Sequence, residues 1–330
     1  MSKSVLVLGG SYFIGKKIVS TLCENGYEVT TLNRGTKPNQ NANVKTIICN
    51  RDNPEQMKNA LKDYLFDFVI DVSALTAKQV EISCQALHKS KLQKYIFISS
   101  SAVYDVDHYP APYLENTPLA ENQYWTDYGK NKIEAEQYLT KALKKTHTSL
   151  VILRPPYVYG EENYVQRESF IFHHILNDMP ILVPNDGETK IQFIYTADLA
   201  NIVNELLTHT SPPVSLYNVG NLNGVSYREW IESCAKAVGK EAIIVPFSYE
   251  AYGYQVRDFF PFYDYNNVLD VKVIKYIYDT ETDFIQGLKS SYQWFLNNQD
   301  NILWKDNVTK NEQVILSQLY QNSKDISYDN

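Results

Sequence analysis

The sequence contains few of the residues that mark a secreted, metal-binding or membrane-spanning protein. Among its 330 residues there are only four cysteines, which are far apart and have no histidine at the spacing of metal ligands: Cys23, Cys49, Cys84 and Cys234. This pattern is typical of thiols in a reducing compartment rather than of a disulfide framework or a zinc site. The chain shows no signal-like leader, and its apolar runs are too short to span a bilayer. We therefore expect a soluble, cytoplasmic protein with no metal and no membrane partner.

The sequence also lacks an excess of positive charge. It has 31 Lys and Arg residues against 38 Asp and Glu residues, a formal net charge of -7. Because a nucleic-acid-binding surface needs a basic face, we expect no nucleic-acid partner. Apolar residues make up 44% of the chain, which is enough for a buried core.

Short apolar runs alternate with longer helical patterns through the first half of the chain. We predict strands at 5–8, 28–32, 45–49, 68–72, 95–99 and 150–153, and helices at 16–25, 55–62, 77–89 and 130–144. This alternation predicts an α/β, Rossmann-type doubly wound parallel sheet. We assign residues 1–154 to this domain, with returning segments near 190–220. Because prolines and aromatics then cluster, we assign 155–330 mainly to a smaller C-terminal domain for substrate binding.

A glycine-containing turn follows the first predicted strand and fits two kinds of site. From Gly10 it reads G-x-x-x-x-G-K, but a loop for a nucleoside triphosphate needs Ser or Thr after its lysine, and Lys17 stands there. From Gly9 to Gly15 the segment GGSYFIG is a strand–turn–helix junction that can bring backbone N–H groups to a pyrophosphate. The second interpretation is favoured, although Tyr12 replaces the usual middle glycine.

The end of the second predicted strand bears on the choice of dinucleotide. An enzyme that selects NAD usually has an acidic residue there, whereas an arginine suits the 2′-phosphate of NADP. This chain has Asn33 followed by Arg34, which can pair with a phosphate. The alternative is a turn with an exposed arginine. We predict NADP or NAD as the cofactor, with a mild preference for NADP.

Tyr128 and Lys132 are four residues apart, so both side chains emerge on one face of a helix. A free tyrosine has a pKa of about 10, and its use as a base near neutrality needs a depression of roughly three units, about 4 kcal/mol. A nearby ammonium favours such a depression. The pair alone is common on helix surfaces, so its meaning depends on the surrounding motifs.

Four further motifs accompany this pair. FISSSAVY at 97–104 places hydroxyl groups at the C-terminal edge of a strand, where open parallel sheets bind ligands. LRPPYVYG at 153–160, FIYTADLA at 193–200 and YNVG at 217–220 follow. In this order the motifs resemble the short-chain dehydrogenase/reductase superfamily, and within it the extended or atypical NAD-dependent epimerase/dehydratase family. The resemblance covers about residues 4–220 and favours hydride transfer over phosphate hydrolysis.

The resemblance implies a role for each matching position. Tyr128 is the expected general acid/base, and Lys132 holds the nicotinamide ribose and lowers the pKa of Tyr128. Ser100 polarises the reacting oxygen, with Ser99 and Ser101 as fallback choices. The other expected cofactor contacts are Gly9, Gly10, Ser11, Tyr12, Phe13, Ile14, Gly15, Asn33, Arg34, Asn50, Arg51, Ser73, Ala74, Ser99, Pro155, Pro156 and Val158. The expected substrate contacts are Ser101, Tyr157, Arg167 and Gln192.

Two positions on the substrate side depart from the family pattern. Tyr157 stands where many sugar-nucleotide enzymes have a substrate-contacting Asn, and Ile191 stands where they have the Arg that grips the diphosphate. An aliphatic side chain cannot supply that charge-assisted contact. Arg167, and after it Arg228 and Arg257, are the candidates in the second domain for holding an anionic substrate, although each is more often a surface residue.

Together these motifs predict an NAD(P)-dependent epimerase or reductase that acts at a carbinol or carbonyl carbon. The substrate class is a hydroxylated compound, which includes sugars and sugar nucleotides. The alternative is a non-catalytic member of the same fold that senses NADP(H) or binds RNA or protein, and tight RNA binding at physiological salt would favour it. A homodimer is expected by analogy alone.

Overall fold

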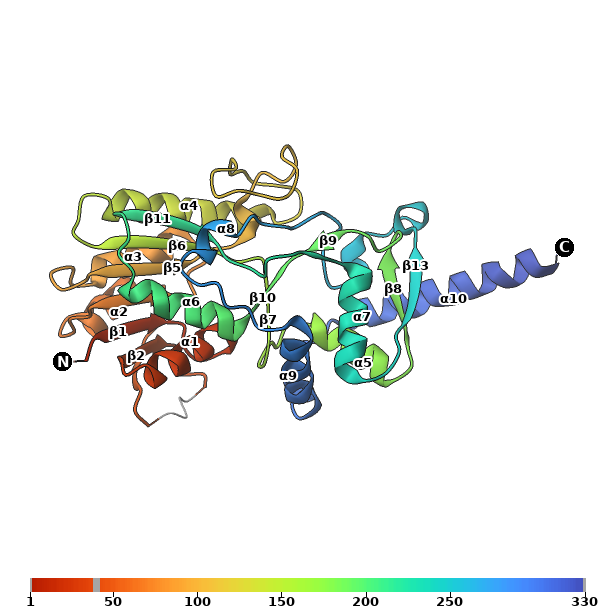
Figure 1. The fold of residues 1–330 in the computed structure, drawn as a ribbon, viewed down its shortest axis with the longest axis horizontal. Coiled ribbons are helices and arrows are strands. Elements are labelled where there is room, and N and C mark those ends of the chain that lie inside the picture. The colour runs from red at the N-terminus through yellow and green to blue at the C-terminus, as the bar shows by residue number, and fades with distance from the viewer. Residues whose placement is uncertain (1, 38–41, 329–330) are drawn as a thin grey trace. The chain divides into compact units, whose positions relative to one another are not determined.

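The computed structural model describes residues 2–37 and 42–328 (Figure 1). The chain divides into two compact units. Unit 1 comprises the residues up to Gly160, Gln192–Gly224 and Asn267–Thr282. Unit 2 comprises Glu161–Ile191, Val225–Asn266 and the residues from Asp283 onward.

A parallel sheet of seven strands forms the centre of unit 1, with the strand order β11-β6-β5-β4-β1-β2-β3. The order from β3 to β6 is that of the Rossmann fold, so the predicted fold class is confirmed. The strand order reverses between β1 and β4, and ligands of such sheets bind beyond the carboxyl ends of the strands at this point. The strands are β1 (Ser4–Leu8), β2 (Glu28–Asn33), β3 (Lys45–Ile48), β4 (Phe68–Asp71), β5 (Lys94–Ile98), β6 (Ser149–Arg154) and β11 (Val214–Asn218).

Helices cover both faces of this sheet because alternate strand residues point to opposite sides (Figure 1). In β1, Val5 and Val7 join an apolar cluster with residues of α1 (Phe13–Glu24) and α6 (Thr196–Thr208). Leu6 and Leu8 join a second cluster with residues of three other helices, α2 (Pro54–Leu61), α3 (Ala77–Ala86) and α4 (Thr126–Leu143). Unit 1 also contains β7 (Tyr157–Tyr159), paired in parallel with β10 (Phe193–Tyr195), and the short α8 (Lys272–Lys275).

Three predicted helix boundaries are wrong by three or four residues. Helix α1 begins at Phe13 rather than at 16. Helix α4 begins at Thr126 rather than at 130, so Tyr128 lies in its first turn. The chain enters this helix through a turn in which the Asn122 carboxamide oxygen accepts hydrogen bonds from the N–H groups of Tyr124 and Trp125. Helix α3 ends at Ala86 rather than at 89, because the next residue has extended backbone.

Unit 2 combines two short strand pairs with helices around an aromatic core. The side chains of Trp230, Phe247, Phe259, Phe260 and Phe262 are at most 1% exposed. Strand β8 (Pro180–Pro184) is parallel to β13 (Ile243–Phe247), and β9 (Lys190–Ile191) is antiparallel to β12 (Val225–Ser226). The helices are α5 (Glu168–Leu176), α7 (Tyr227–Val238), α9 (Phe284–Leu296) and α10 (Asp306–Tyr328). Over the described ranges of the chain, none of the helices has the length and apolar character needed to cross a membrane.

Candidate active site

The turn after β1 has room for backbone but not for side chains. Gly9 has φ +95°, and its N–H donates to the carbonyl of Leu32 in β2. A Cβ at Gly15 would lie 1.9 Å from the carbonyl oxygen of Gly9, so the first turn of α1 packs directly on the turn. Both positions therefore require glycine.

Helix α1 begins without a side-chain cap. Its N-cap residue, Tyr12, has extended backbone and makes no side-chain hydrogen bond to the first-turn N–H groups. Such N–H groups lack partners within the helix and attract anions. The Tyr12 ring is 39% exposed and lies under the Lys37 ammonium, 4.5 Å from the ring centroid. The N–H groups of the turn and of the helix end are of the kind that hold a pyrophosphate.

The loop after β4 is fixed by a buried ion pair. The two terminal nitrogens of Arg51 donate to the two carboxylate oxygens of Asp71, each at 2.8 Å. Arg51 also donates to Ser73 Oγ at 2.7 Å, and the Ala74 N–H donates to Asp71. Burial alone would raise the pKa of Asp71, but Arg51 and the hydroxyl of Tyr95 hold it below its usual range.

This pair gives Arg51 contacts within the protein. Its terminal nitrogens bond Asp71, Ser73 and Ser83 in the core, and its expected contact with a cofactor stays a prediction. The bond to Ser73 fixes the position of that side chain. A Cβ at Gly9 would lie 2.5 Å from the Cβ of Ser73, so this loop presses directly on the glycine turn.

Lys132 joins helix α4 to the ends of two strands. Its side chain is buried, and Nζ donates to the carbonyl of Ala74 at 2.7 Å and to that of Ile98 at 2.8 Å. Nζ also lies 4.8 Å from the centroid of the Phe97 ring. Burial lowers the pKa of Lys132 to about 8. An ammonium has three donors, so these two carbonyls leave one N–H for a ligand.

Tyr128 lies in the first turn of α4, and its side chain is 37% exposed. The next residue, Gly129, approaches the η1 turn (Ser101–Val103) so closely that a Cβ there would lie 2.5 Å from the carbonyl oxygen of Ala102. This contact holds the first turn of α4 against the segment that follows β5. It therefore brings Tyr128 and Ser100 to the same edge of the sheet.

Burial distinguishes the three consecutive serines. Ser99 and Ser101 are 4% and 3% exposed, whereas Ser100 is partly exposed. The Ser100 hydroxyl oxygen accepts a hydrogen bond from the Ala102 N–H at 3.2 Å and caps η1. Of the three, only Ser100 combines exposure with a fixed position. Ser101 is buried beside the β6 end, where its N–H donates to the carbonyl of Pro155.

Ser99, an expected cofactor contact, belongs to a buried polar network. Its hydroxyl donates to Glu136 at 2.5 Å, and Glu136 also accepts from Arg154 through Nε and Nη2. Arg154 Nη1 contacts the hydroxyl of Tyr104, whose own partner is Asn218. Sequence reasoning missed this network, because its members are spread over more than a hundred positions.

The residues at the ends of β2 and β3 are on the surface. The Asn33 side chain accepts from the Gly35 N–H, and the Asn50 side chain accepts from the Asp52 N–H, so both shape local turns. Arg34 is exposed and makes no hydrogen bond or ion pair within the described ranges of the chain. It is therefore available to a negatively charged ligand.

The expected substrate contacts in unit 1 are mostly buried. Gln192 is fully buried, and its carboxamide bonds the backbone of Asn221 and Leu269; its contact with substrate stays a prediction. Tyr157 is 4% exposed, and its ring lies 6.2 Å from that of Trp125. Pro155, Pro156 and Val158 are buried beside it.

Trp125 is a neighbour of Tyr128 that sequence reasoning missed. The two ring centroids are 5.8 Å apart, and the tryptophan is only partly buried. The sequence could have indicated this contact, because Trp125 is three residues before Tyr128 and residues at that spacing lie on one side of a helical turn. Arg167, the remaining expected substrate contact, lies in unit 2 at the N-cap of α5.

Comparison with known proteins agrees with this geometry. The model of the NAD-dependent epimerase/dehydratase family matches residues 5–220 of the chain. The chain belongs to this family. The matched segment contains the glycine turn, Ser100, Tyr128 and Lys132.

Relatives within the family carry different functions in their names. A chloroplast stem-loop binding protein of 41 kDa from Arabidopsis thaliana is 28% identical over 311 residues, 88% of this chain and 78% of that protein. A putative UDP-glucose 4-epimerase of Methanocaldococcus jannaschii is 26% identical over 324 residues, 89% of this chain and 99% of the relative. The structure of dTDP-glucose 4,6-dehydratase from Bacillus anthracis, in complex with NAD, matches with a TM-score of 0.73 at 18% identity and covers 93% of this chain and 100% of that one.

Family membership confirms the predicted family and places the chain among epimerases, dehydratases and reductases. The structural match shows a shared fold. The dinucleotide named with that structure is NAD, and these proteins give no support to a preference for NADP.

Proposed function

We propose that unit 1 binds a nicotinamide dinucleotide and that Tyr128, beside it, transfers a proton to or from a hydroxylated substrate. One observation carries the proposal: Lys132 ties the Tyr128 helix to the loop after β4, which itself presses on the glycine turn after β1. The backbone of residues 9–15 would hold the pyrophosphate, and Lys132 the ribose. When bound, the dinucleotide supplies or accepts the hydride.

The residues of the chain have distinct roles in this proposal. As the phenolate, the exposed Tyr128 side chain takes the proton of a substrate hydroxyl during oxidation, and as the phenol it returns that proton during reduction. The Lys132 ammonium favours the phenolate. The Ser100 hydroxyl donates a hydrogen bond to the reacting oxygen.

For the substrate we propose a sugar or sugar nucleotide, converted by epimerisation or reduction. The names of the relatives support this class. The diphosphate contact must differ from that of many family members, since Ile191 is aliphatic and fully buried. We also propose a cytoplasmic homodimer, since all four cysteines are free thiols and the family analogy favours a dimer.

The decisive experiment is to denature the purified protein and identify any released nucleotide by mass spectrometry. Retained NAD(H) supports an epimerase, which regenerates its cofactor within each cycle. Bound NADP(H) supports a reductase. Failure of an empty protein to bind either added dinucleotide would overturn the proposal.

We propose that Arg34 gives the chain a preference for NADP. Arg34→Ala is then expected to weaken NADP binding about tenfold by removing a charge-assisted contact, with NAD binding unchanged. Titration of nicotinamide fluorescence with both dinucleotides measures the two affinities. Lys58→Ala, at an exposed position of α2, is the control and should change neither. An equal loss of affinity for NAD and NADP would show that Arg34 does not contact the 2′-phosphate.

The pH profile should report the charge of Lys132. Its pKa is about 8 in the free protein because of burial, so the ammonium is present below that pH and is lost above it. Loss of the charge removes the stabilisation of the Tyr128 phenolate, and we therefore expect kcat/KM to fall as pH rises past about 8. Lys94 is the control, because burial lowers its pKa to about 8 as well. Its ammonium donates to the backbone carbonyls of Leu207 and His209 and not to the proposed site. The Lys94→Met variant should show the same decrease of kcat/KM at high pH as the wild type. If the decrease were absent from this variant, the assignment to Lys132 would be contradicted.

A second candidate function is RNA binding, which the name of the chloroplast relative favours. The net charge of -7 opposes it. Gel-shift titration with a stem-loop RNA at physiological salt separates the two, because the oxidoreductase proposal expects no specific complex.

A further inference from the structure

Helix α4 holds the end of β5 through two buried, charged side chains. Lys132 Nζ donates to the carbonyl of Ile98, and one helical turn later the Glu136 carboxylate accepts from the hydroxyl of Ser99 at 2.5 Å. Residues four positions apart are neighbours on one face of a helix. Lys132 is 3% exposed and Glu136 is 4% exposed. The helix therefore binds two consecutive residues at the end of this strand, directly before Ser100.

The Glu136 carboxylate has hydrogen-bond donors on both of its oxygens. Arg154, at the end of β6, donates to Oε1 through Nε at 3.0 Å and to Oε2 through Nη2 at 2.6 Å, and the Ser99 hydroxyl adds a third donor. A buried carboxylate needs such partners, because it has lost the water that would otherwise solvate its charge. This arrangement keeps a negative charge in the interior of unit 1, one helical turn from Lys132.

The charge of Lys132 depends on its buried surroundings. Burial lowers the pKa of Lys132 to about 8, and three charged groups modify this effect. Asp71, at the end of β4, favours the ammonium, Arg51, in the loop after β3, opposes it, and Glu136 favours it. Because Arg51 is paired with Asp71, its positive charge offsets part of the support from that side. Glu136 thus adds negative charge on which the ammonium depends near neutral pH.

We propose that Glu136 is a positioning residue that holds the Lys132 ammonium in its charged form against the end of β5. The inference rests on the function proposed for unit 1, in which this ammonium binds the dinucleotide ribose and favours the Tyr128 phenolate. Glu136 is buried between Arg154 and Ser99, so it acts through Lys132 and not by contact with a ligand.

The test is dinucleotide affinity as a function of pH, a measurement that needs no substrate. NADH and NADPH are titrated into the full chain and followed by nicotinamide fluorescence. The affinity of the wild type should begin to fall at about pH 8, where Lys132 loses its charge. Glu136→Gln keeps the shape of the side chain but removes its charge, which lowers the pKa of Lys132. We therefore expect the fall to begin about one pH unit lower in this variant.

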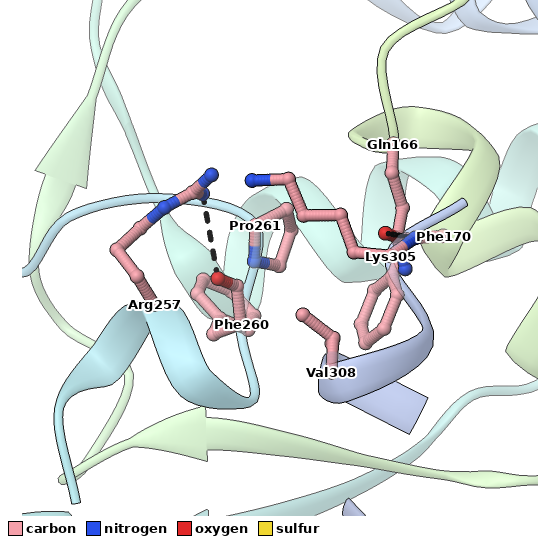
Figure 2. A pocket seen from close by; sticks show the side chains of 7 residues that line it. All are labelled: Gln166, Phe170, Arg257, Phe260, Pro261, Lys305 and Val308. Atoms are coloured by element: carbon pink, nitrogen blue, oxygen red, sulfur yellow. Dashed lines mark hydrogen bonds between the residues drawn. The ribbon is translucent and has the colours of Figure 1, made fainter. Parts of the chain in front are cut away.

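Two control variants remove buried polar contacts without changing the charge beside Lys132. Tyr104→Phe removes the hydroxyl that accepts from Arg154 in the same buried polar network. Gln166→Met acts in unit 2, where the Gln166 side chain accepts from the backbone N–H of Lys305 at 2.9 Å beside a small pocket (Figure 2). Both variants should show the pH dependence of the wild type. Thermal unfolding of each variant confirms that it is folded.

A second variant covers the case in which Glu136→Gln does not fold. That substitution leaves the buried guanidinium of Arg154 without a charged partner, which is strongly destabilising. Glu136→Leu/Arg154→Met removes the whole ion pair, a change that proteins often tolerate. Its affinity should also begin to fall at a lower pH than that of the wild type, because the negative charge on α4 is gone.

The possible outcomes separate this inference from the function on which it rests. An unchanged pH dependence in folded Glu136→Gln, or in the double variant, would overturn the inference alone, because Lys132 would then not depend on Glu136. An equal shift in Tyr104→Phe would also overturn it, since the effect would then follow from any disturbance of the network. A wild-type protein that binds neither dinucleotide would overturn the proposed function and this inference with it.

Discussion

Tyr128→Phe is expected to lower turnover by about 100-fold to 10,000-fold while leaving dinucleotide affinity unchanged, the range for loss of a general acid/base. The substitution removes one oxygen atom and with it the proton that the proposed mechanism moves. The ring remains, so its packing 5.8 Å from Trp125 is kept. The side chain is 37% exposed, so we expect removal of its hydroxyl to change the free energy of unfolding little. The effect should therefore appear in kcat and not in stability.

A matched control separates this effect from the loss of any surface hydroxyl. Tyr64 is 38% exposed and lies in the loop before β4, with its ring stacked on Phe66. Tyr64→Phe should turn over as the wild type does. The measurement is reduction of the bound dinucleotide by a panel of sugar nucleotides, followed by nicotinamide absorbance. A Tyr128→Phe protein that retains full turnover would remove the proposed mechanism.

The fold and the glycine turn could be predicted because their signals are local. A buried parallel strand is a continuous apolar run, and a turn that excludes side chains requires glycine within a few residues of the strand. Gly9 and Gly15 carry this signal in the sequence itself. The spacing of Tyr128 and Lys132 is also a local signal, because residues four positions apart lie on the same face of a helix.

The details of the site could not be predicted, because they depend on contacts between distant residues. Arg51 and Asp71 are twenty positions apart, and nothing in the sequence distinguishes an arginine in an ion pair from one that faces a cofactor. The burial of Gln192 could not be predicted for the same reason, because its partners Asn221 and Leu269 are distant in the sequence. The sequence has serine at all three positions from 99 to 101, and only the folded structure shows that Ser99 and Ser101 are buried and Ser100 is partly exposed.

Arg51→Met is expected to lower the free energy of unfolding by about 3–5 kcal/mol, the cost of leaving a buried charge without its partner. Asp71 is fully buried and would lose both guanidinium contacts, keeping only the Tyr95 hydroxyl and the Ala74 N–H. Urea unfolding measures the loss as a lower midpoint. Lys78→Met is the control, because the ion pair of Lys78 with Glu81 is exposed and should contribute less than about 1 kcal/mol.

The same substitution tests whether the ion pair positions the site. Without Arg51, Ser73 loses its contact beside Gly9, and the loop whose Ala74 carbonyl holds Lys132 is less fixed. We therefore expect weaker dinucleotide binding in Arg51→Met even at temperatures where the protein is folded. The double variant Arg51→Met/Asp71→Leu should regain much of the stability, since a buried ion pair can be replaced by apolar side chains. It should not regain the affinity, because neither new side chain can hold the Ser73 hydroxyl or the Ala74 N–H. Recovery of both properties together would show that the pair serves stability alone.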